Sequence, residues 1–254
     1  MRGLRGKRVL VSGGSSGIGA AAVQRFLEEG CRVFVGGVDA DGVQDTVSAL
    51  RHLGDVRGLP GDISEEGGAS DLVSAAVQAF GGLDVLANNA GIAWRESFLE
   101  ITASHWDHML AVNLRGMFLV AQAVARVLVE QGTGGAIVNM ASTNGLAGEP
   151  DYAHYNASKA GVLLLTKTMA VELGRHGIRV NALCPGYIRT ALNEQIAASI
   201  SPDFIESYAR AHIPLLRTGL PDQVAAAYAF LASEDAAFVS GSELVVDGGQ
   251  LAVM

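Results

Sequence analysis

Cysteine is scarce in this chain, which has 2 among its 254 residues. Cys31 and Cys184 cannot form a disulfide framework, and both lie in apolar, strand-like runs where buried structural thiols are common. Metal-ligand spacing is missing too, since His105 and His108 share one predicted helical face but have no third ligand nearby. We therefore expect two structural thiols, no disulfide and no metal site.

Positive charge is also in short supply. The chain has 18 Lys and Arg against 26 Asp and Glu, a formal net charge of −8 that repels phosphate backbones and anionic lipid headgroups. No apolar run approaches the roughly 18 residues needed to cross a bilayer, and the apolar stretch 9–11 is too short for a signal peptide. We therefore expect a cytoplasmic protein with no nucleic-acid or membrane partner.

Interdomain linkers and repeats are absent as well. No Pro-, Gly- or Ser-rich linker, fixed-period repeat or low-complexity tract divides the chain, and its 49% of hydrophobic residues can fill a sizeable core. We expect residues 1–254 to form one domain. The one long stretch without a predicted strand, 189–220, exceeds an ordinary loop, and we interpret it as a substrate lid.

Short apolar runs alternate with longer helical patterns along most of the sequence, as in parallel β-α-β units. The runs are almost continuously apolar, as strands covered by helices on both faces should be. The pattern predicts an α/β fold: a single doubly wound, Rossmann-type domain whose parallel sheet has about seven strands. The predicted strands are 8–12, 32–37, 56–59, 83–87, 136–141, 179–183 and 243–246, and the predicted helices are 17–29, 41–53, 65–80, 103–130, 152–175 and 221–232.

A glycine-rich turn follows the first predicted strand and precedes a helix. Its sequence over residues 12–19 is SGGSSGIG. Glycines let the backbone approach a pyrophosphate closely, and the start of a helix favours negative charge. The spacing Gly13-x-x-x-Gly17-x-Gly19 departs from G-x-G-x-x-G, so the turn taken alone is either a dinucleotide site or merely a tight turn.

A tyrosine and a lysine lie four residues apart in a predicted helix. This spacing puts Tyr155 and Lys159 on one helical face, where the ammonium would lower the phenol pKa from its ordinary value of about 10. Such a tyrosine can exchange a proton with a substrate hydroxyl near neutral pH, although the pair taken alone favours an ordinary surface contact. Ser142, thirteen residues before Tyr155, ends a predicted strand, where open α/β sheets present ligand groups.

In their order and spacing, these motifs resemble the short-chain dehydrogenase/reductase family over nearly the whole chain. Further matching pieces are residues 88–91, Asn113, residues 185–190 and residues 246–249. The resemblance implies that Tyr155 is the general acid/base and that Ser142 hydrogen-bonds the reacting oxygen. It also implies that Lys159 holds the nicotinamide ribose and lowers the Tyr155 pKa, while Asn113 helps to hold a proton-relay water.

The resemblance implies a nicotinamide dinucleotide cofactor, and we expect NAD rather than NADP. Gly37 stands at the expected acidic position after the second strand, and Asp39, two residues later, is the ribose contact we expect. A 2′-phosphate would meet Asp39 and Asp41 with no cation nearby in the sequence. Asp62 matches an adenine contact but is also placed to cap a helix. The implied cofactor-binding residues are Gly13, Ser15, Ser16, Gly17, Ile18, Gly19, Asp39, Asp62, Ile63, Asn89, Ala90, Gly91, Tyr155, Lys159, Pro185, Gly186, Ile188 and Thr190.

We expect an NAD(P)-dependent alcohol dehydrogenase or ketoreductase that interconverts a secondary alcohol and a ketone by hydride transfer. The alternative is a catalytically idle dinucleotide-binding sensor or scaffold, which needs the glycines but not the proton-relay set. A sugar-nucleotide epimerase or dehydratase is disfavoured by the glycine spacing. The substrate stays open among sugars, polyols, hydroxysteroids, cyclic alcohols, aryl ketones and acyl thioesters. Candidate substrate contacts are Arg95, Glu96, Asn144, Glu149 and Tyr187, while His154 either lines the pocket or points away from it.

The two longest predicted helices, 103–130 and 152–175, carry Ala, Val and Leu on more than one face. With so little charge on the chain, such helices are more easily buried between subunits than left in water. The resemblance also implies that these helices pair across subunit interfaces. We therefore expect a homodimer or homotetramer. The residues that suggest the contact are Ala121, Ala125, Val162, Leu165 and Ala170.

Overall fold

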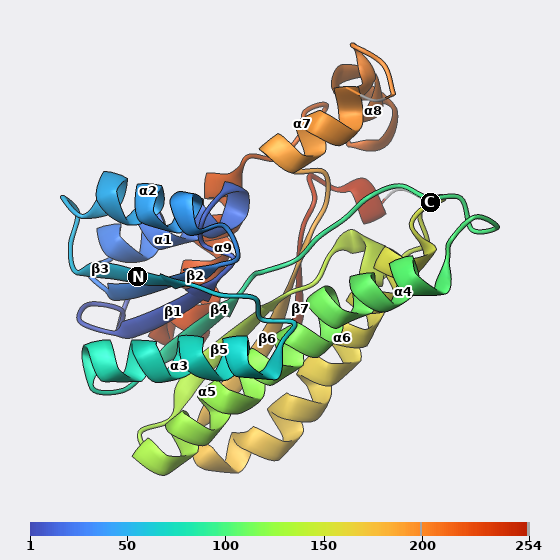
Figure 1. Ribbon diagram of the computed structural model, residues 1–254. Coiled ribbons are helices and arrows are strands. Elements are labelled where there is room, and N and C mark those ends of the chain that lie inside the picture. Colours follow the sequence, from blue (N-terminus) through green and yellow to red (C-terminus); the bar gives the residue numbers. More distant parts are fainter. Residues whose placement is uncertain (199, 253–254) are drawn as a thin grey trace.

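Seven parallel strands form one sheet in the computed structural model, which describes residues 1–198 and 200–252 (Figure 1). The strand order is β3-β2-β1-β4-β5-β6-β7, and every neighbouring pair is parallel. Because β2 and β3 lie between β1 and β4 in the chain, the winding reverses where β1 and β4 meet. The predicted doubly wound α/β fold is confirmed. The strands are β1 (Arg8–Ser12), β2 (Arg32–Gly37), β3 (Val56–Pro60), β4 (Val85–Asn88), β5 (Gly135–Met140), β6 (Ile178–Pro185) and β7 (Glu243–Val246).

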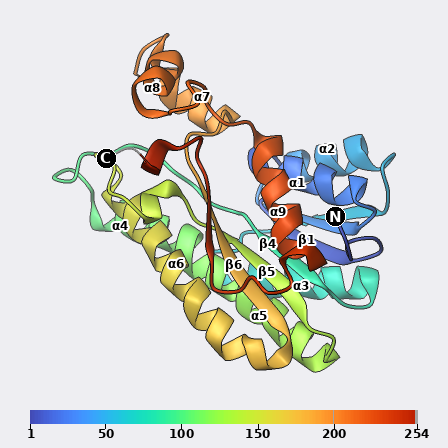
Figure 2. The ribbon, with the colours of Figure 1, turned by 180° about the vertical axis from the view of Figure 1, so that it is seen from behind.

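Helices cover both faces of the sheet, as Figures 1 and 2 show from opposite sides. Alternation along β1 explains the two layers: Val9 and Val11 pack with buried residues of α1 and α9, whereas Leu10 packs with those of α3 and α5. One face carries α1 (Gly17–Glu28), α2 (Ala40–Leu50) and α9 (Pro221–Ala232), and the other carries α3 (Glu66–Phe80), α5 (Met117–Gln131) and α6 (Ala153–Leu173).

A chain of buried polar side chains crosses the middle of the sheet. Ser12 Oγ donates to Asn88 Oδ1 over 3.1 Å, and Asn88 Nδ2 donates to Asn139 Oδ1 over 3.1 Å. Asn139 Nδ2 in turn donates to Thr166 Oγ1 on α6 over 3.0 Å. All four residues are at most 1% exposed. This buried polar chain (Ser12, Asn88, Asn139 and Thr166) therefore fixes three strands and α6 relative to one another, away from competing water.

The predicted continuous helix over 103–130 is interrupted in the structure. α4 (Ala103–Leu110) passes into a π-helical turn, Ala111–Gly116, before α5 begins. Asn113 lies in this turn, and π turns often mark functional sites. By length and composition, Ala103–Gln131 is also the one helical stretch of the described chain that could cross a membrane. Of its most apolar window, 44% is buried inside the protein, and buried residues of α5 pack in the core against the sheet.

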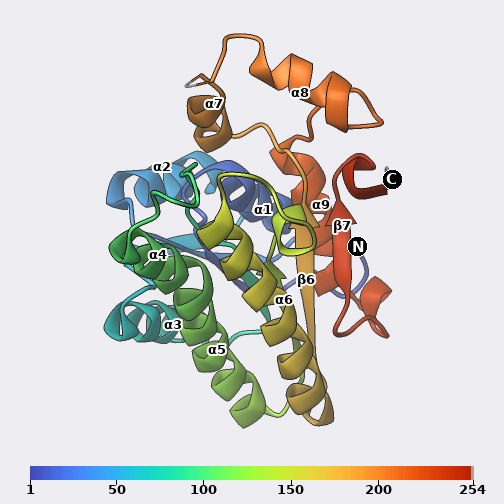
Figure 3. The same cartoon turned by 90° about the vertical axis from the view of Figure 1, so that its right-hand side faces the viewer.

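Two short helices, α7 and α8, stand above the carboxyl ends of the strands (Figure 3). They occupy the predicted lid segment 189–220, of which Ser199 lies outside the described residues. An isolated parallel bridge joins Ile188 to Gly219. The segment therefore leaves the body of the protein and returns to it at one point. The two helices are α7 (Ala191–Ala198) and α8 (Phe204–His212).

The other predicted boundaries differ from the observed ones by at most two residues, except that α2 ends at Leu50 rather than at 53. Differences of this size arise because helix ends fray and tighten into 3₁₀ turns. The end of α6 is an example, since the predicted helix runs on to 175 through such a turn. The 3₁₀ turns are η2 (Thr143–Gly145), η3 (Gly174–His176), η4 (Glu234–Ala236) and η5 (Gln250–Ala252).

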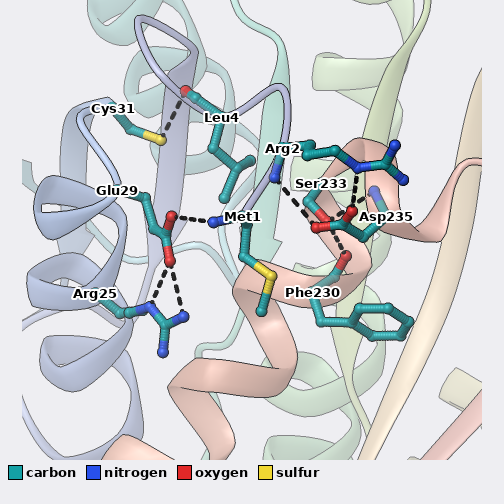
Figure 4. Close-up of polar contacts among 9 residues, drawn as sticks. All are labelled: Met1, Arg2, Leu4, Arg25, Glu29, Cys31, Phe230, Ser233 and Asp235. Atoms are coloured by element: carbon teal, nitrogen blue, oxygen red, sulfur yellow. Dashed lines mark hydrogen bonds and ion pairs between the residues drawn. The ribbon is translucent and has the colours of Figure 1, made fainter.

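The first residues of the chain link α1 to the end of α9 (Figure 4). The Met1 amino group lies 2.6 Å from Glu29 Oε2, and Arg25 of α1 bonds the other oxygen of the same carboxylate. Arg2 donates its backbone N–H and its Nε–H to Asp235, which lies in η4 just after α9. These contacts reinforce the packing of α1 against α9 on one face of the sheet.

Both cysteines are buried and free. Cys31 Sγ lies 3.2 Å from Leu4 O, and Cys184 is fully buried in β6. Burial raises the pKa of each thiol to about 12. Both cysteines are therefore protonated at neutral pH and poor nucleophiles, in agreement with the structural role predicted for them.

An ion pair joins the amino ends of β1 and β4. Arg8 donates its backbone N–H and Nε–H to Asp84 Oδ2 over 2.8 Å each, and Nη2 reaches Asp84 Oδ1 over 2.9 Å. The two side chains are only 22% and 15% exposed. Burial raises the pKa of Asp84, but the hydrogen bonds and charge of Arg8 lower it by more, so the folded-state pKa lies below its ordinary value.

We expect Asp84→Asn to lower the free energy of unfolding by about 1–3 kcal/mol at pH 7, because a charged hydrogen-bond acceptor is lost. The contribution of the carboxylate is complete above the unfolded pKa of about 3.9 and is lost as the pH falls through the lowered folded-state pKa. Urea unfolding of both proteins from pH 7 to pH 3 should show the difference shrinking. Asp55→Asn, whose ion pair with Arg32 is more exposed, should cost less than about 1 kcal/mol. A constant difference across this pH range would contradict the assignment.

Candidate active site

The carboxyl ends of β1, β4, β5 and β6 meet at one edge of the sheet, and the predicted site residues follow them. The glycine-rich turn follows β1, Asn89 follows β4, Ser142 follows β5 and Gly186 follows β6. This edge includes the β1/β4 junction where the winding reverses, the position at which open α/β sheets form a crevice. Residues distant in sequence are thereby gathered around one site.

The glycines of the turn are required by its shape. Gly13 and Gly17 have φ values of +66° and +52°, which side chains rarely adopt. A Cβ at Gly19 would lie 1.9 Å from Gly13 O, and a Cβ at Gly13 would lie 2.6 Å from Ala90 Cα. Asn89 Nδ2 donates to Gly13 O over 3.0 Å. The turn therefore packs closely against the segment after β4, and a side chain at Gly13 or Gly19 would clash with the backbone.

The start of α1 is open toward this edge. Ser16, the residue before the helix, is extended and makes no side-chain capping bond to it. The first N–H groups of the helix therefore have no side-chain cap from Ser16, and they favour an anion. Thr190, from the segment after β6, packs against the turn, since a Cβ at Gly17 would lie 3.4 Å from its Cγ2. The turn, the helix start and this segment form a cradle that fits a pyrophosphate.

Asp39 lies at the start of α2, exposed and without a side-chain capping bond. Gly37 ends β2, and a Cβ there would lie 3.0 Å from Ser15 Oγ. An acidic side chain at position 37 would therefore crowd Ser15, whereas Asp39 is free of that restriction. Asp39 is the nearer of the two predicted aspartates to the strand end.

Asp62 and Ile63 follow β3. Asp62 Oδ1 accepts from the backbone N–H of Ser64 over 2.9 Å and from its hydroxyl over 2.7 Å. The carboxylate thus caps the turn before α3, the local role that the sequence also allowed. Ile63 is buried, and a Cβ at Gly116 would lie 3.0 Å from its carbonyl oxygen, which ties this segment to the π turn.

Asn113 holds the segment after β4 in place. Its Oδ1 accepts from Ile92 N and its Nδ2 donates to Ile92 O, over 2.8 Å each. A Cβ at Gly91 would lie 3.1 Å from Asn113 Oδ1 and 3.4 Å from Lys159 Nζ. The π turn therefore places Asn113 beside the predicted lysine. The predicted proton-relay role remains a prediction, and the contacts described are structural.

Lys159 is almost completely buried, at 2% exposure. Its Nζ donates to Met140 O over 2.9 Å, the one hydrogen bond that the described residues provide for it. Burial lowers the Lys159 pKa to about 8, so the amine is still mostly protonated at pH 7. An ammonium with three N–H donors and one partner fits the hydroxyl groups of a bound ribose.

Tyr155 lies above this lysine, with Lys159 Nζ 5.6 Å from the ring centroid. Burial raises the Tyr155 pKa to about 12, a hydrogen bond with Ser142 lowers it, and the charge of Glu149 raises it. The expectation that Lys159 lowers this pKa below its ordinary value is therefore not met in this structure. The shared helical face was predicted correctly, but Lys159 Nζ bonds Met140 O and faces the ring, and burial dominates.

Ser142 belongs to a hydrogen-bond network behind Tyr155. Its Oγ accepts from Asn144 N over 3.2 Å, and Asn144 Nδ2 donates to Glu149 Oε2 over 2.8 Å and to Asn156 Oδ1 over 2.9 Å. Asn156 Nδ2 donates back to Glu149 O over 2.9 Å. Two of the predicted substrate-contact candidates, Asn144 and Glu149, are therefore joined to Ser142. Asn156 was missed, although it lies next to Tyr155 in the same motif.

Aromatic rings of α8 and of Tyr187, which follows β6, form a wall above the carboxyl ends of the strands. Tyr187 and Tyr208 have ring centroids 5.1 Å apart, and Tyr208 and Phe204 are 5.6 Å apart. Gln250 Nε2 donates to the Tyr208 hydroxyl over 2.9 Å. Tyr187 belongs to this wall, and its predicted role as a substrate contact stays a prediction; Gln250 was missed. Its sequence signal is its place directly after the Asp247-Gly248-Gly249 motif.

Glu96 and His154 contact Trp94 rather than the Tyr155 hydroxyl. Glu96 accepts from Trp94 Nε1 over 3.1 Å and lies 2.9 Å from His105 Nδ1. His154 is fully buried edge-on to Trp94, and its Nδ1 accepts from the backbone N–H of Tyr155 over 2.9 Å. His154 thus takes the second of its two predicted orientations, away from the Tyr155 hydroxyl. Arg95 pairs with Asp151 over 2.6 Å at the surface.

Comparisons with known proteins agree with this geometry. A family model described as enoyl-(acyl carrier protein) reductase matches residues 13–250. The crystal structure of a short-chain type dehydrogenase/reductase from Mycobacterium marinum superimposes with a TM-score of 0.92 at 35% identity, over 97% of this chain and 96% of that one. The chain belongs to the short-chain dehydrogenase/reductase family.

Two curated relatives in this family show different named activities. An L-rhamnose 1-dehydrogenase (NAD(P)(+)) from Sphingomonas sp. (strain SKA58) is 39% identical over 251 residues, 98% of each chain. A (3R)-3-hydroxyacyl-CoA dehydrogenase from Mus musculus is also 39% identical, over 97% of this chain and 96% of its own. The relatives support an oxidoreductase of a family that uses NAD(P). Within the family, the cradle and the free N–H donors of Lys159 fit such a dinucleotide.

Proposed function

We propose that this short-chain dehydrogenase/reductase interconverts a secondary alcohol and a ketone by hydride transfer, with Tyr155 as general acid/base. The observation that carries the proposal is that the Ser142 hydroxyl lies close enough to Tyr155 to lower its pKa, with Tyr155 above the buried Lys159. These groups come from the end of β5 and from α6, beside the glycine-rich cradle. Two hydroxyl groups that converge in this way can hold one substrate oxygen and exchange a proton with it.

When bound, a nicotinamide dinucleotide supplies or accepts the hydride at the substrate carbon. Ser142 donates to the substrate oxygen and stabilises the charge that develops there. With its pKa raised to about 12, Tyr155 is a neutral phenol at pH 7, the form that donates a proton to an alkoxide during carbonyl reduction. Lys159 keeps two N–H donors for ribose hydroxyls below the Tyr155 ring.

A catalytically idle binding protein is the alternative, and the burial of Lys159 weighs against it. Burying an amine in an apolar site carries a desolvation cost of several kcal/mol. A binder needs the cradle around Gly13 and Gly17 but has no need for a desolvated lysine beneath a tyrosine and a serine. The buried lysine is explained by proton transfer and ribose binding together.

We expect Tyr155→Phe to reduce turnover by about 10²- to 10⁴-fold, the usual share of general acid/base catalysis, with NADH binding retained. Ser142→Ala should be severely impaired as well. Tyr228→Phe is the matched control, because Tyr228 is buried in α9 and its hydroxyl has no hydrogen-bond partner among the described residues. Steady-state rates over a panel of alcohols and ketones measure turnover, and fluorescence titration with NADH measures cofactor binding. Near-normal turnover by Tyr155→Phe would refute the assignment.

For the cofactor, we propose that NAD(H) is preferred over NADP(H). Asp39 is exposed at the start of α2 and forms no ion pair with any described residue, so its carboxylate is available to ribose hydroxyls. A 2′-phosphate at the same place would be repelled by Asp39 and by Asp41 in the first turn of α2.

We expect a higher kcat/KM with NAD(H) than with NADP(H). Asp39→Ala should lower the ratio of the NAD(H) value to the NADP(H) value. Asp45→Ala, farther along α2 and exposed, is the control and should leave the ratio unchanged. The measurement is initial rate against cofactor concentration for each protein. A wild-type preference for NADP(H) of about tenfold, equal to 1.4 kcal/mol, would reverse the proposal.

For assembly, we propose a homodimer or homotetramer, with a contact that differs from the one the sequence suggested. Ala121, Ala125 and Val162 are buried within the chain, at 1%, 8% and 0% exposure, so they cannot face a partner. The reason is that they belong to the helix faces that pack on the sheet. The outer surface instead has a groove of about 600 Å³ between the π turn, α5 and α6, and Phe118 and Leu165 are among its lining residues.

We expect sedimentation equilibrium to show a dimer or tetramer at micromolar concentration. Phe118→Glu should shift the protein toward monomer, because a charge in the apolar groove would be desolvated in the contact. Far-ultraviolet circular dichroism checks that the variant is folded. A stable wild-type monomer at micromolar concentration would exclude the proposed assembly.

A further inference from the structure

Two loops that border the site are fastened to each other. The loop 146–152 joins η2 to α6, and the loop 92–99 follows Gly91. Glu96 N donates to Asp151 O over 2.8 Å, and Arg95 Nη2 lies 2.6 Å from Asp151 Oδ2. Asp151 is held at a φ of +67°, a value that residues other than glycine rarely adopt. The loop 146–152 therefore has a fixed path beside Tyr155.

Glu149 is the charged residue that this loop brings inward. It is half-buried, and its backbone oxygen and Oε2 both accept from the amides of Asn156 and Asn144. Asn144 also donates its backbone N–H to Ser142 Oγ, so one residue separates the Glu149 carboxylate from the predicted catalytic serine. Glu149 Oε1 has no hydrogen-bond partner among the described residues. A carboxylate oxygen with free lone pairs thus lies close to the reacting centre.

No described cation neutralises this carboxylate. Glu149 forms no ion pair with any residue that the structure describes, and the nearby Arg95 is already paired with Asp151. The charge of Glu149 instead acts on four of the described tyrosines. Burial is the largest cause of the raised pKa of each, and the negative charge of Glu149 adds to it. These tyrosines are Tyr152, Tyr155, Tyr187 and Tyr208.

We propose that Glu149 accepts a hydrogen bond from a second hydroxyl group of the substrate, and that the substrate is a neutral polyhydroxylated alcohol, a sugar or polyol. The inference rests on the oxidoreductase function proposed above. A charged acceptor binds a hydroxyl donor more strongly than a neutral one does. The aromatic rings of Tyr187 and Tyr208 offer apolar faces for the C–H groups of such a molecule.

The same carboxylate disfavours the other substrate classes. A substrate with a carboxylate or phosphate near the reacting carbon would face the negative charge of Glu149 at short range. A simple cyclic alcohol or an acyl chain has no donor for Glu149 Oε1, which would then be desolvated without a partner. Sites built around a substrate hydroxyl reject analogues that lack it far more strongly than apolar pockets reject an extra methylene.

The experiment compares three substrates: cis-cyclohexane-1,2-diol, cyclohexanol and 3-hydroxybutyryl-CoA. We expect wild-type kcat/KM to be at least tenfold higher for the diol than for either of the others. Glu149→Gln should lower kcat/KM for the diol by about 10- to 100-fold, the worth of a charged hydrogen bond, and change cyclohexanol oxidation less than threefold. The matched control is Glu206→Gln, an exposed carboxylate on α8, which should leave all three values unchanged.

The possible results distinguish failure of the Glu149 proposal from failure of the proposed oxidoreductase function. If Glu149→Gln lowers all three values equally, the residue only supports the loop and the inference is wrong, while the oxidoreductase stands. If wild type prefers cyclohexanol or the thioester, the substrate class is wrong in the same way. If wild type binds NADH but oxidises none of the three substrates and none of a wider alcohol panel, both proposals are overturned.

Discussion

The hydrogen bonds of Asn88 tie the middle of the sheet to the helices that carry the site. Its side chain accepts from Ser12 on β1 and donates to Asn139 on β5 and to Met117 O at the start of α5. Asn139 extends the chain to Thr166 on α6, the helix of Tyr155 and Lys159. Because each group is buried, breaking one bond leaves another polar atom unpaired in the core. The relative placement of the glycine-rich turn and of α6, which carries Tyr155 and Lys159, therefore depends on one buried network.

The sequence predicted those parts of the molecule that depend on local spacing. Parallel strands buried on both faces are continuously apolar, so the runs around Val9 and Val33 were visible without a structure. The helical repeat likewise put Tyr155 and Lys159 on one face. The π turn around Asn113 was not predictable in this way. Its residue Asn113 forms hydrogen bonds to Ile92 in another segment, and no local pattern encodes that contact.

The electrostatics of the site could not be predicted from spacing either. The pKa of Tyr155 depends on burial, on Ser142 and on Glu149, which reach it from different segments of the chain. The sequence indicated Glu149 as a candidate substrate contact, but the lack of an ion pair at Glu149 becomes visible only when Arg95 is seen to pair with Asp151. Ala121 and Val162 are a similar case. The sequence showed that they are apolar, but only the structure shows that they are buried within the chain and not at its surface.

The bridge between Ile188 and Gly219 gives the segment that carries α7 and α8 a shared anchor at both ends. A segment that starts and finishes at one anchor can change its length or composition without displacing β6 or α9, because neither end has to move. Its loop-closure entropy changes only slowly with length. The segment is in this sense an insertion whose two ends lie side by side. Evolution or protein engineering can therefore change the length and sequence of this segment while the sheet and α6, which carries Tyr155 and Lys159, stay as they are.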